Sequence, residues 1–211
     1  MSAKSPDFSV GYNRRRSSPT RHLTLGLLFQ AAPSSHVFPG ALAREVSAVL
    51  ERRFGFISDN QYSKLETFIG KLSPPGLVRK PDDQVFHSEE LPQPAWEQLQ
   101  HRAAELLGSN ETPHLQFISG QGVYITGSLE PQLVKINQGF ELQVASLSSL
   151  IRELLVYSSA AQLPVEETAL NKVYSIRSRE PQPDLPTLAY LQLMLAAQFA
   201  SRAGCALWVV T

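Results

Sequence analysis

The sequence contains one cysteine, Cys205, in 211 residues. One thiol cannot close an internal disulfide, and it cannot supply the several thiolates of a cysteine-based metal site. This scarcity favours a reducing, cytoplasmic environment. An apolar, strand-like stretch follows Cys205, so we expect the thiol to be a buried packing group rather than a nucleophile.

Long apolar runs and a secretory leader are also lacking. The most apolar stretch, residues 185–200, is interrupted by Gln192 and Gln198 and is short for a helix that crosses a bilayer. Polar and turn-forming residues interrupt the first positions, unlike the charged and then apolar pattern of a leader. We therefore expect a cytoplasmic protein that does not enter a membrane.

Motifs for catalysis or cofactor binding are missing as well. There is no nucleophile elbow, phosphate-cradling loop or dinucleotide fingerprint. His101 and Glu105 have helical i,i+4 spacing, and residues 87–90 group a histidine with two glutamates. Both patterns are more typical of solvated charged surface than of a metal site. We predict no catalytic residue, cofactor or metal, and keep as an alternative an enzyme whose site assembles from residues distant in sequence.

Charge is balanced over the whole chain, with 19 basic and 19 acidic residues, but it is unevenly distributed. The N-terminal residues are basic and the remainder is mildly acidic. The Ser-, Pro- and Arg-rich composition of residues 1–21 predicts a disordered basic arm. Arg14, Arg15 and Arg16 could contact nucleic acid or an acidic partner, and the alternative is a solubilising tail.

Residues 22–211 are predicted to form a single α+β domain. Apolar stripes predict helices at 39–54, 58–72, 94–107, 147–155 and 185–203, while residues 165–177 fit either helix or strand. Strand-like stretches at 114–118 and 123–126 flank a glycine-bearing turn, which predicts a β-hairpin that continues into an antiparallel meander. A C-terminal strand is expected at 206–210. About five helices should therefore pack on a small antiparallel sheet.

The predicted core centres on the last helix and strand. The expected buried residues are Leu191, Met194, Leu195, Phe199, Leu207 and Trp208, with Leu150, Leu154, Phe117 and Tyr124 against them.

Residues 39–72 are predicted to form an αα-hairpin, with Gly55 in the turn and a capping box from Ser58 to Gln61. Two helices with a short turn are also the outline of a DNA-binding helix-turn-helix. The second helix uses its apolar stripe for packing, and the region beyond the arm is net acidic, so a packing unit is favoured. Nucleic-acid binding through the arm and this hairpin remains the alternative.

Residues 77–93 are predicted to be an irregular loop that binds a protein partner. The loop has more apolar residues than an idle connection needs, and a charged rim around an aromatic residue is typical of a protein-binding edge. The candidate contacts are Val85, Phe86, Asp82, Asp83, Glu89 and Glu90. The alternative is that Phe86 only anchors the loop to the core. The leading functional hypothesis is a non-enzymatic protein-binding module, such as an adaptor, an inhibitor or an assembly subunit.

Overall fold

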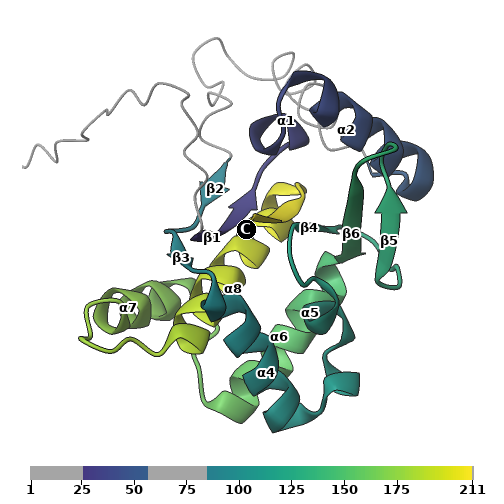
Figure 1. Ribbon diagram of the computed structural model, residues 1–211. Helices are drawn as coiled ribbons and strands as arrows, with labels where there is room; N and C mark the ends of the chain where they lie inside the picture. The colour runs from purple at the N-terminus through teal and green to yellow at the C-terminus, as the bar shows by residue number, and fades with distance from the viewer. Residues whose placement is uncertain (1–25, 57–84, 211) are drawn as a thin grey trace, which may run out of the picture.

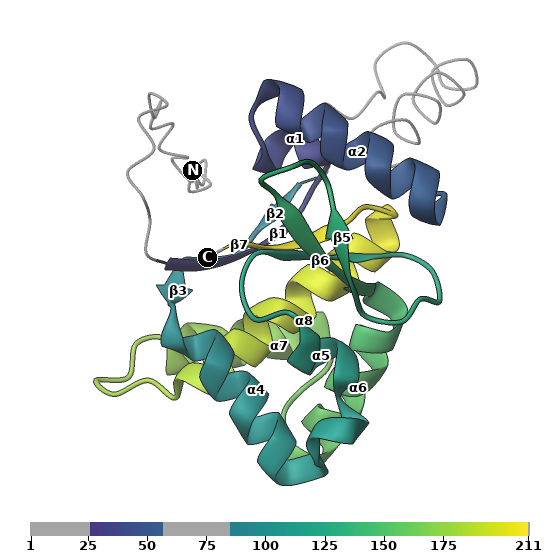
Figure 2. The same cartoon turned by 45° about the vertical axis from the view of Figure 1, so that its right-hand side comes forward.

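The computed structural model describes residues 26–56 and 85–210, which form a sheet with helices on both faces (Figure 1). Figure 2 shows α1 and α2 on one side of the sheet and α4 to α8 on the other. The helices in these ranges are α1 (Ser34–Val37), α2 (Gly40–Phe54), α4 (Pro94–Leu107), α5 (Pro113–Phe117), α6 (Leu147–Ala161), α7 (Glu167–Arg177) and α8 (Leu185–Ala203), with a 3-10 turn, η2 (Ser109–Glu111). The strands are β1 (Gly26–Ala31), β2 (Phe86–His87), β3 (Leu91–Pro92), β4 (Gly122–Ile125), β5 (Gln132–Lys135), β6 (Glu141–Ser146) and β7 (Leu207–Val210). The α+β class is therefore confirmed.

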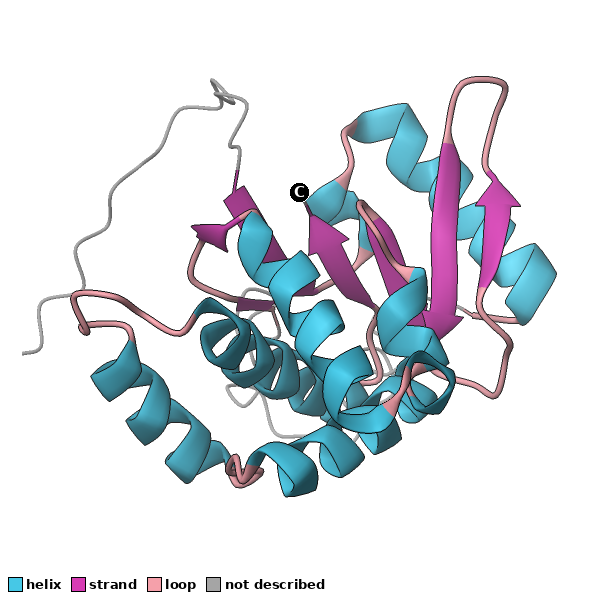
Figure 3. Cartoon of the chain, turned by 60° about the horizontal axis from the view of Figure 1, so that its bottom comes forward, coloured by secondary structure: helices cyan, strands magenta, loops and turns pink. Residues whose placement is uncertain are grey.

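The sheet is mixed rather than antiparallel. Its strand order is β2–β1–β7–β4–β6–β5, and β3 also pairs with β1. The strand β4 runs parallel to β6, with Tyr124 opposite Ala145, while it is antiparallel to β7. The C-terminal strand β7 lies between β1 and β4, as Figure 3 shows from below. The predicted antiparallel sheet is wrong at the β4–β6 pair, because β4 is a central strand with two distant partners.

The predicted β-hairpin at 114–126 is also wrong, because its first half is the helix α5. Pro113 occupies the first turn, and the carboxylate of Glu153 on α6 accepts hydrogen bonds from the backbone N–H groups of His114 (3.0 Å) and Leu115 (2.8 Å). A carboxylate that satisfies free N–H groups stabilises the start of a helix. The capping group comes from 38 residues away, so local alternation could not reveal it.

The larger core lies between the sheet and α4 to α8. The helix α8 is buried on nearly all sides, as its shortage of polar residues predicts. Tyr124 and Leu207 face it from the sheet, and Trp96 of α4 packs edge-on against Phe29 at 5.7 Å. The ten predicted core residues are all buried or partly buried, and Cys205 is buried as expected.

A second apolar cluster lies on the opposite face, under α1 and α2. Val46 and Leu50 of α2 are fully buried there, and Gly55 ends the helix in the left-handed conformation with φ of 66°. Trp208 belongs to this cluster and not to the α8 side, because β7 alternates its side chains between the two faces. Its indole N–H donates to the carbonyl of Ala32 at 2.9 Å.

The number of helices also differs from the expected five or so, since the described residues contain seven. The short helices α1 and α5 have too few residues for a periodic stripe, and residues 165–177 resolve into α7. The predicted helices at 39–54, 94–107, 147–155 and 185–203 are confirmed, with α6 extending to Ala161. The predicted arm at 1–21 and the predicted helix at 58–72 lie outside the described residues.

Candidate functional site

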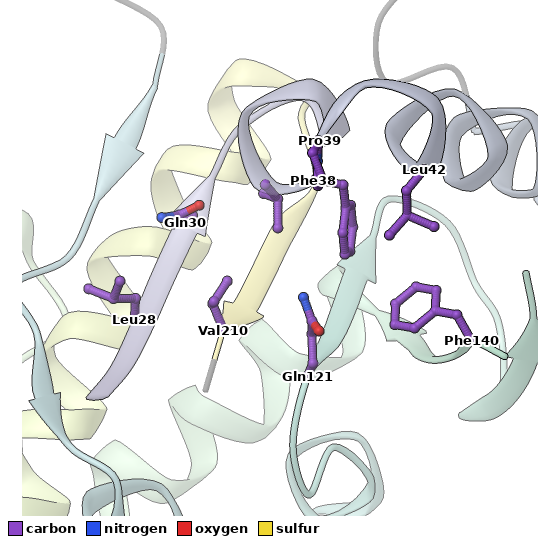
Figure 4. Close-up of a pocket in the computed structure, with 9 residues that line it drawn as sticks. Leu28, Gln30, Phe38, Pro39, Leu42, Gln121, Phe140 and Val210 are labelled. Atoms are coloured by element: carbon purple, nitrogen blue, oxygen red, sulfur yellow. The ribbon is translucent and has the colours of Figure 1, made fainter. Parts of the chain in front are cut away.

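A groove of about 330 Å³ opens on the α1–α2 face of the sheet. Figure 4 shows the side chains that line it, which come from β1 and β7, from the α1–α2 elbow, and from the residues just before β4 and β6. We call this feature the elbow groove. Its lining consists of Leu28, Gln30, Val37, Phe38, Pro39, Leu42, Gln121, Phe140 and Val210. None of these nine residues is charged or titratable.

One side of the elbow groove is a wall of aromatic rings. Phe38 packs edge-on against Trp208, with ring centroids 5.3 Å apart, and against Phe140 at 5.6 Å. Phe38 is buried between its two neighbours, whereas Leu28, Leu42 and Val210 remain partly exposed. The groove therefore combines a packed aromatic wall with apolar side chains that are still accessible to an apolar ligand.

The lining of the groove extends across several strands. Its lining starts on β1 and ends at Phe140, beside the first residue of β6, and β7 and β4 lie between. Three strand-to-strand spacings correspond to about 14 Å, which is about the distance from the first to the last of five residues in an extended chain. This length suits a short peptide segment.

Gln30 is the most unusual polar group in the lining. Its Oε1 is buried and has no hydrogen-bond partner among the described residues. An unsatisfied buried acceptor costs about 1–3 kcal/mol of stability. Buried polar groups in native proteins are otherwise nearly always paired, so an orphaned one calls for an explanation such as a binding role.

Two histidines border the β1 end of the elbow groove. His87 of β2 is paired in register with Gln30 and so faces the same side of the sheet. Partial burial, and secondly the proximity of His36 on α1, lower the pKa of His87. The neutral imidazole is therefore the favoured form at this rim near neutral pH.

The predicted partner-binding residues are only partly within the described ranges. Phe86 is half-buried in β2 and packs against Phe199 of α8, with centroids 5.9 Å apart. These contacts match the anchoring alternative for this residue. Glu89 accepts a hydrogen bond from the Tyr174 hydroxyl at 3.0 Å, and the side chain of Glu90 lies over Gly26.

The other predicted partner-binding residues do not line the elbow groove or lie outside the described residues. Val85 precedes β2 and is half-buried. Asp82, Asp83, Arg14, Arg15 and Arg16 lie outside the described residues. A role in partner binding stays a prediction for all of these positions.

Two further polar clusters connect helices to one another. His114 Nδ1 lies 2.7 Å from Glu153 Oε1, and the opposite ring nitrogen lies 3.1 Å from the carbonyl oxygen of Leu129. Arg102 of α4 forms two hydrogen bonds, of 2.7 and 2.8 Å, with Asp184 at the start of α8. Desolvation alone would raise the pKa of Asp184, but the hydrogen bonds from Arg102 and Thr187, together with the positive charges of Arg102 and Arg177, outweigh it and lower that pKa. The His114–Glu153 pair is largely buried and the Arg102–Asp184 pair is partly exposed, and each joins two helices.

Metal and membrane sites find no support in the described ranges. Residues 26–56 and 85–210 contain no group of three or more His, Cys, Asp or Glu side chains placed to hold a metal ion. His101 Nε2 lies 3.1 Å from Glu105 Oε1 and both side chains are exposed, in agreement with the solvated-surface interpretation. Within the same ranges, no helix is long and apolar enough to cross a bilayer.

The sequence did not mark the elbow groove as a site. Its residues come from five separate segments, which meet through the β1–β7, β4–β7 and β4–β6 pairings and through the packing of Phe38 against Phe140 and Trp208. The one local signal is Gln30, a polar residue inside an otherwise apolar strand. No protein-family model, curated protein or solved structure matches the chain.

Proposed function

We propose that the protein is a non-enzymatic protein-binding module that takes an apolar, extended segment of a partner protein into the elbow groove. The observation that carries this proposal is the uncharged lining of the groove, which extends from β1 to the residue before β6. Acid–base and nucleophilic catalysis need titratable groups near the reacting atoms. The nine lining residues supply none, and His36 and His87 lie outside the lining. Binding is what this set of side chains can perform.

The two lining glutamines support a peptide as the ligand. Each amide offers both a donor and an acceptor, which are the two groups that a peptide backbone presents at every residue. Gln30 is on β1 and Gln121 precedes β4, so the two amides are separated along the groove. The last torsion of a glutamine side chain is soft, so a small rotation lets Gln30 Oε1 accept from a bound backbone N–H.

A peptide-display selection on the full chain tests this proposal. Peptides that bind should be rich in apolar residues, and Leu42→Glu should weaken their binding at least tenfold, because a carboxylate would then face an apolar ligand. Leu133→Glu is the matched control, since Leu133 is an exposed leucine on β5 away from the groove. Gln121→Trp fills the groove without adding charge and should weaken binding as well. If the peptides bind Leu42→Glu and Gln121→Trp as tightly as the control Leu133→Glu, and thermal melts show that all three variants are folded, the proposal is refuted.

A further inference from the structure

The elbow groove lies close to the point where the N-terminal residues join the described fold. Leu28 lines the groove and is two positions after Gly26, where β1 begins. Twenty-five residues precede Gly26 in the sequence. These residues are therefore joined covalently to one wall of the groove.

Residues 8–12 of this N-terminal segment have the composition of a ligand for the groove. Phe8, Val10 and Tyr12 alternate with Ser9 and Gly11. In an extended backbone alternate side chains share one face, and five residues place the first and last about 13 Å apart. This length is close to the span of the groove. The five residues carry no charge, and neither does the lining.

The connection between these residues and the fold is long enough. Residues 13–25 would have a root-mean-square length of about 20 Å as a flexible chain. The groove spans about 14 Å across the strands, so residues 8–12 can reach all of it. Tethering at this length gives an effective concentration in the millimolar range, so even a weak contact would be well populated.

We infer that residues 8–12 occupy the elbow groove in the free protein, as an internal ligand that a partner segment must displace. This inference rests on the proposed function, because the same groove serves both ligands. The apparent affinity for a partner is then reduced by the fraction of molecules in which the groove is filled. Release of the N-terminal segment is the step that makes the groove available.

Paramagnetic relaxation in the full chain tests this contact. A nitroxide attached through Ser9→Cys would face away from the apolar side chains, and the native Cys205 is buried and should not react. Methyl NMR signals of Leu28, Leu42 and Val210 should broaden strongly. The signals of Leu133 and Leu155, exposed leucines that do not line the groove, should change little. Weak, uniform broadening of all methyl groups would overturn the inference.

Two variants separate apolar docking from charge attraction. Replacement of Phe8 and Tyr12 by Ser should abolish the selective broadening, because it removes the two large side chains. Replacement of Arg14, Arg15 and Arg16 by Gln should leave it in place. The reverse pattern would show that the basic residues hold the segment and would overturn the inference.

Partner-type peptides distinguish this inference from the proposed function. A peptide selected on the full chain should bind the Phe8→Ser, Tyr12→Ser variant at least threefold more tightly than the unaltered chain. If the peptide binds both proteins equally well and Leu42→Glu still weakens its binding, only the internal ligand is refuted. If the selective broadening is seen but the selection yields no binding peptide with either protein, the internal ligand stands and the protein-binding proposal is refuted.

Discussion

Replacement of Gln30 by Met should make the protein more stable and a poorer binder. The Oε1 atom of Gln30 is buried without a hydrogen-bond partner among the described residues. Folding therefore removes this atom from water without a compensating hydrogen bond, which lowers the stability of the folded state. Methionine has a similar length and no polar group to leave unpaired. Removal of the orphaned acceptor should therefore raise the free energy of unfolding by about 1–2 kcal/mol. For a chain of this size each kcal/mol corresponds to about 2–4 °C in melting temperature.

Chemical denaturation with urea measures this difference directly. Gln121→Met is the matched control, because Gln121 lines the same groove but has no orphaned buried atom; its stability should change by less than about 0.5 kcal/mol. Peptides selected on the unaltered protein should bind Gln30→Met more weakly, since the backbone acceptor is lost. A loss of stability of more than about 1 kcal/mol in Gln30→Met would refute the reasoning, because an amide that stabilises the fold by that much must be hydrogen-bonded.

Three further substitutions test the packing around the site. Gly122→Ala should destabilise the fold by about 1–3 kcal/mol, because a Cβ there would lie 2.7 Å from Ile118 and 3.1 Å from the Gln143 carbonyl oxygen. An unchanged urea midpoint would show that β4 and β6 pack less closely than these distances indicate. Glu153→Gln should cost about 1–3 kcal/mol, since the amide keeps one of two acceptor oxygens, while exposed Glu130→Gln should cost little. The pKa of His87 is lowered in the fold, so the unfolded chain binds the extra proton first as the pH falls. The free energy of unfolding therefore has its full value above pH 6.5 and declines as the pH falls below that value. His87→Gln should reduce this decline. An identical pH dependence in the two proteins would contradict the lowered pKa of His87.

Periodicity in the sequence predicted the long elements well. The apolar stripe of residues 39–54 and the all-round apolar character of residues 185–203 correspond to α2 and α8, and Gly55 and Gly204 end them in the left-handed conformation. Such signals are local, because they depend on neighbouring residues of one helix. Strand β7 was also predictable, since β-branched and aromatic residues follow Gly204.

The errors arose where distant residues decide the structure. Residues 114–118 alternate like a strand but form α5, because Glu153 caps it from another helix. Gly122 was interpreted as part of a hairpin turn, yet it permits close packing of β4 against Ile118 and the Gln143 backbone. The elbow groove was unpredictable for the same reason, since its five segments have no pattern in common.

Methyl NMR with a selected peptide is the most direct measurement of the elbow groove as a binding site. Titration should shift the signals of Leu28, Val37, Leu42 and Val210, which line the groove in the structure. The signals of Leu106, Leu155 and Val156, which are exposed but distant from the lining, should stay in place. Shifts confined to this second group would contradict the proposed function.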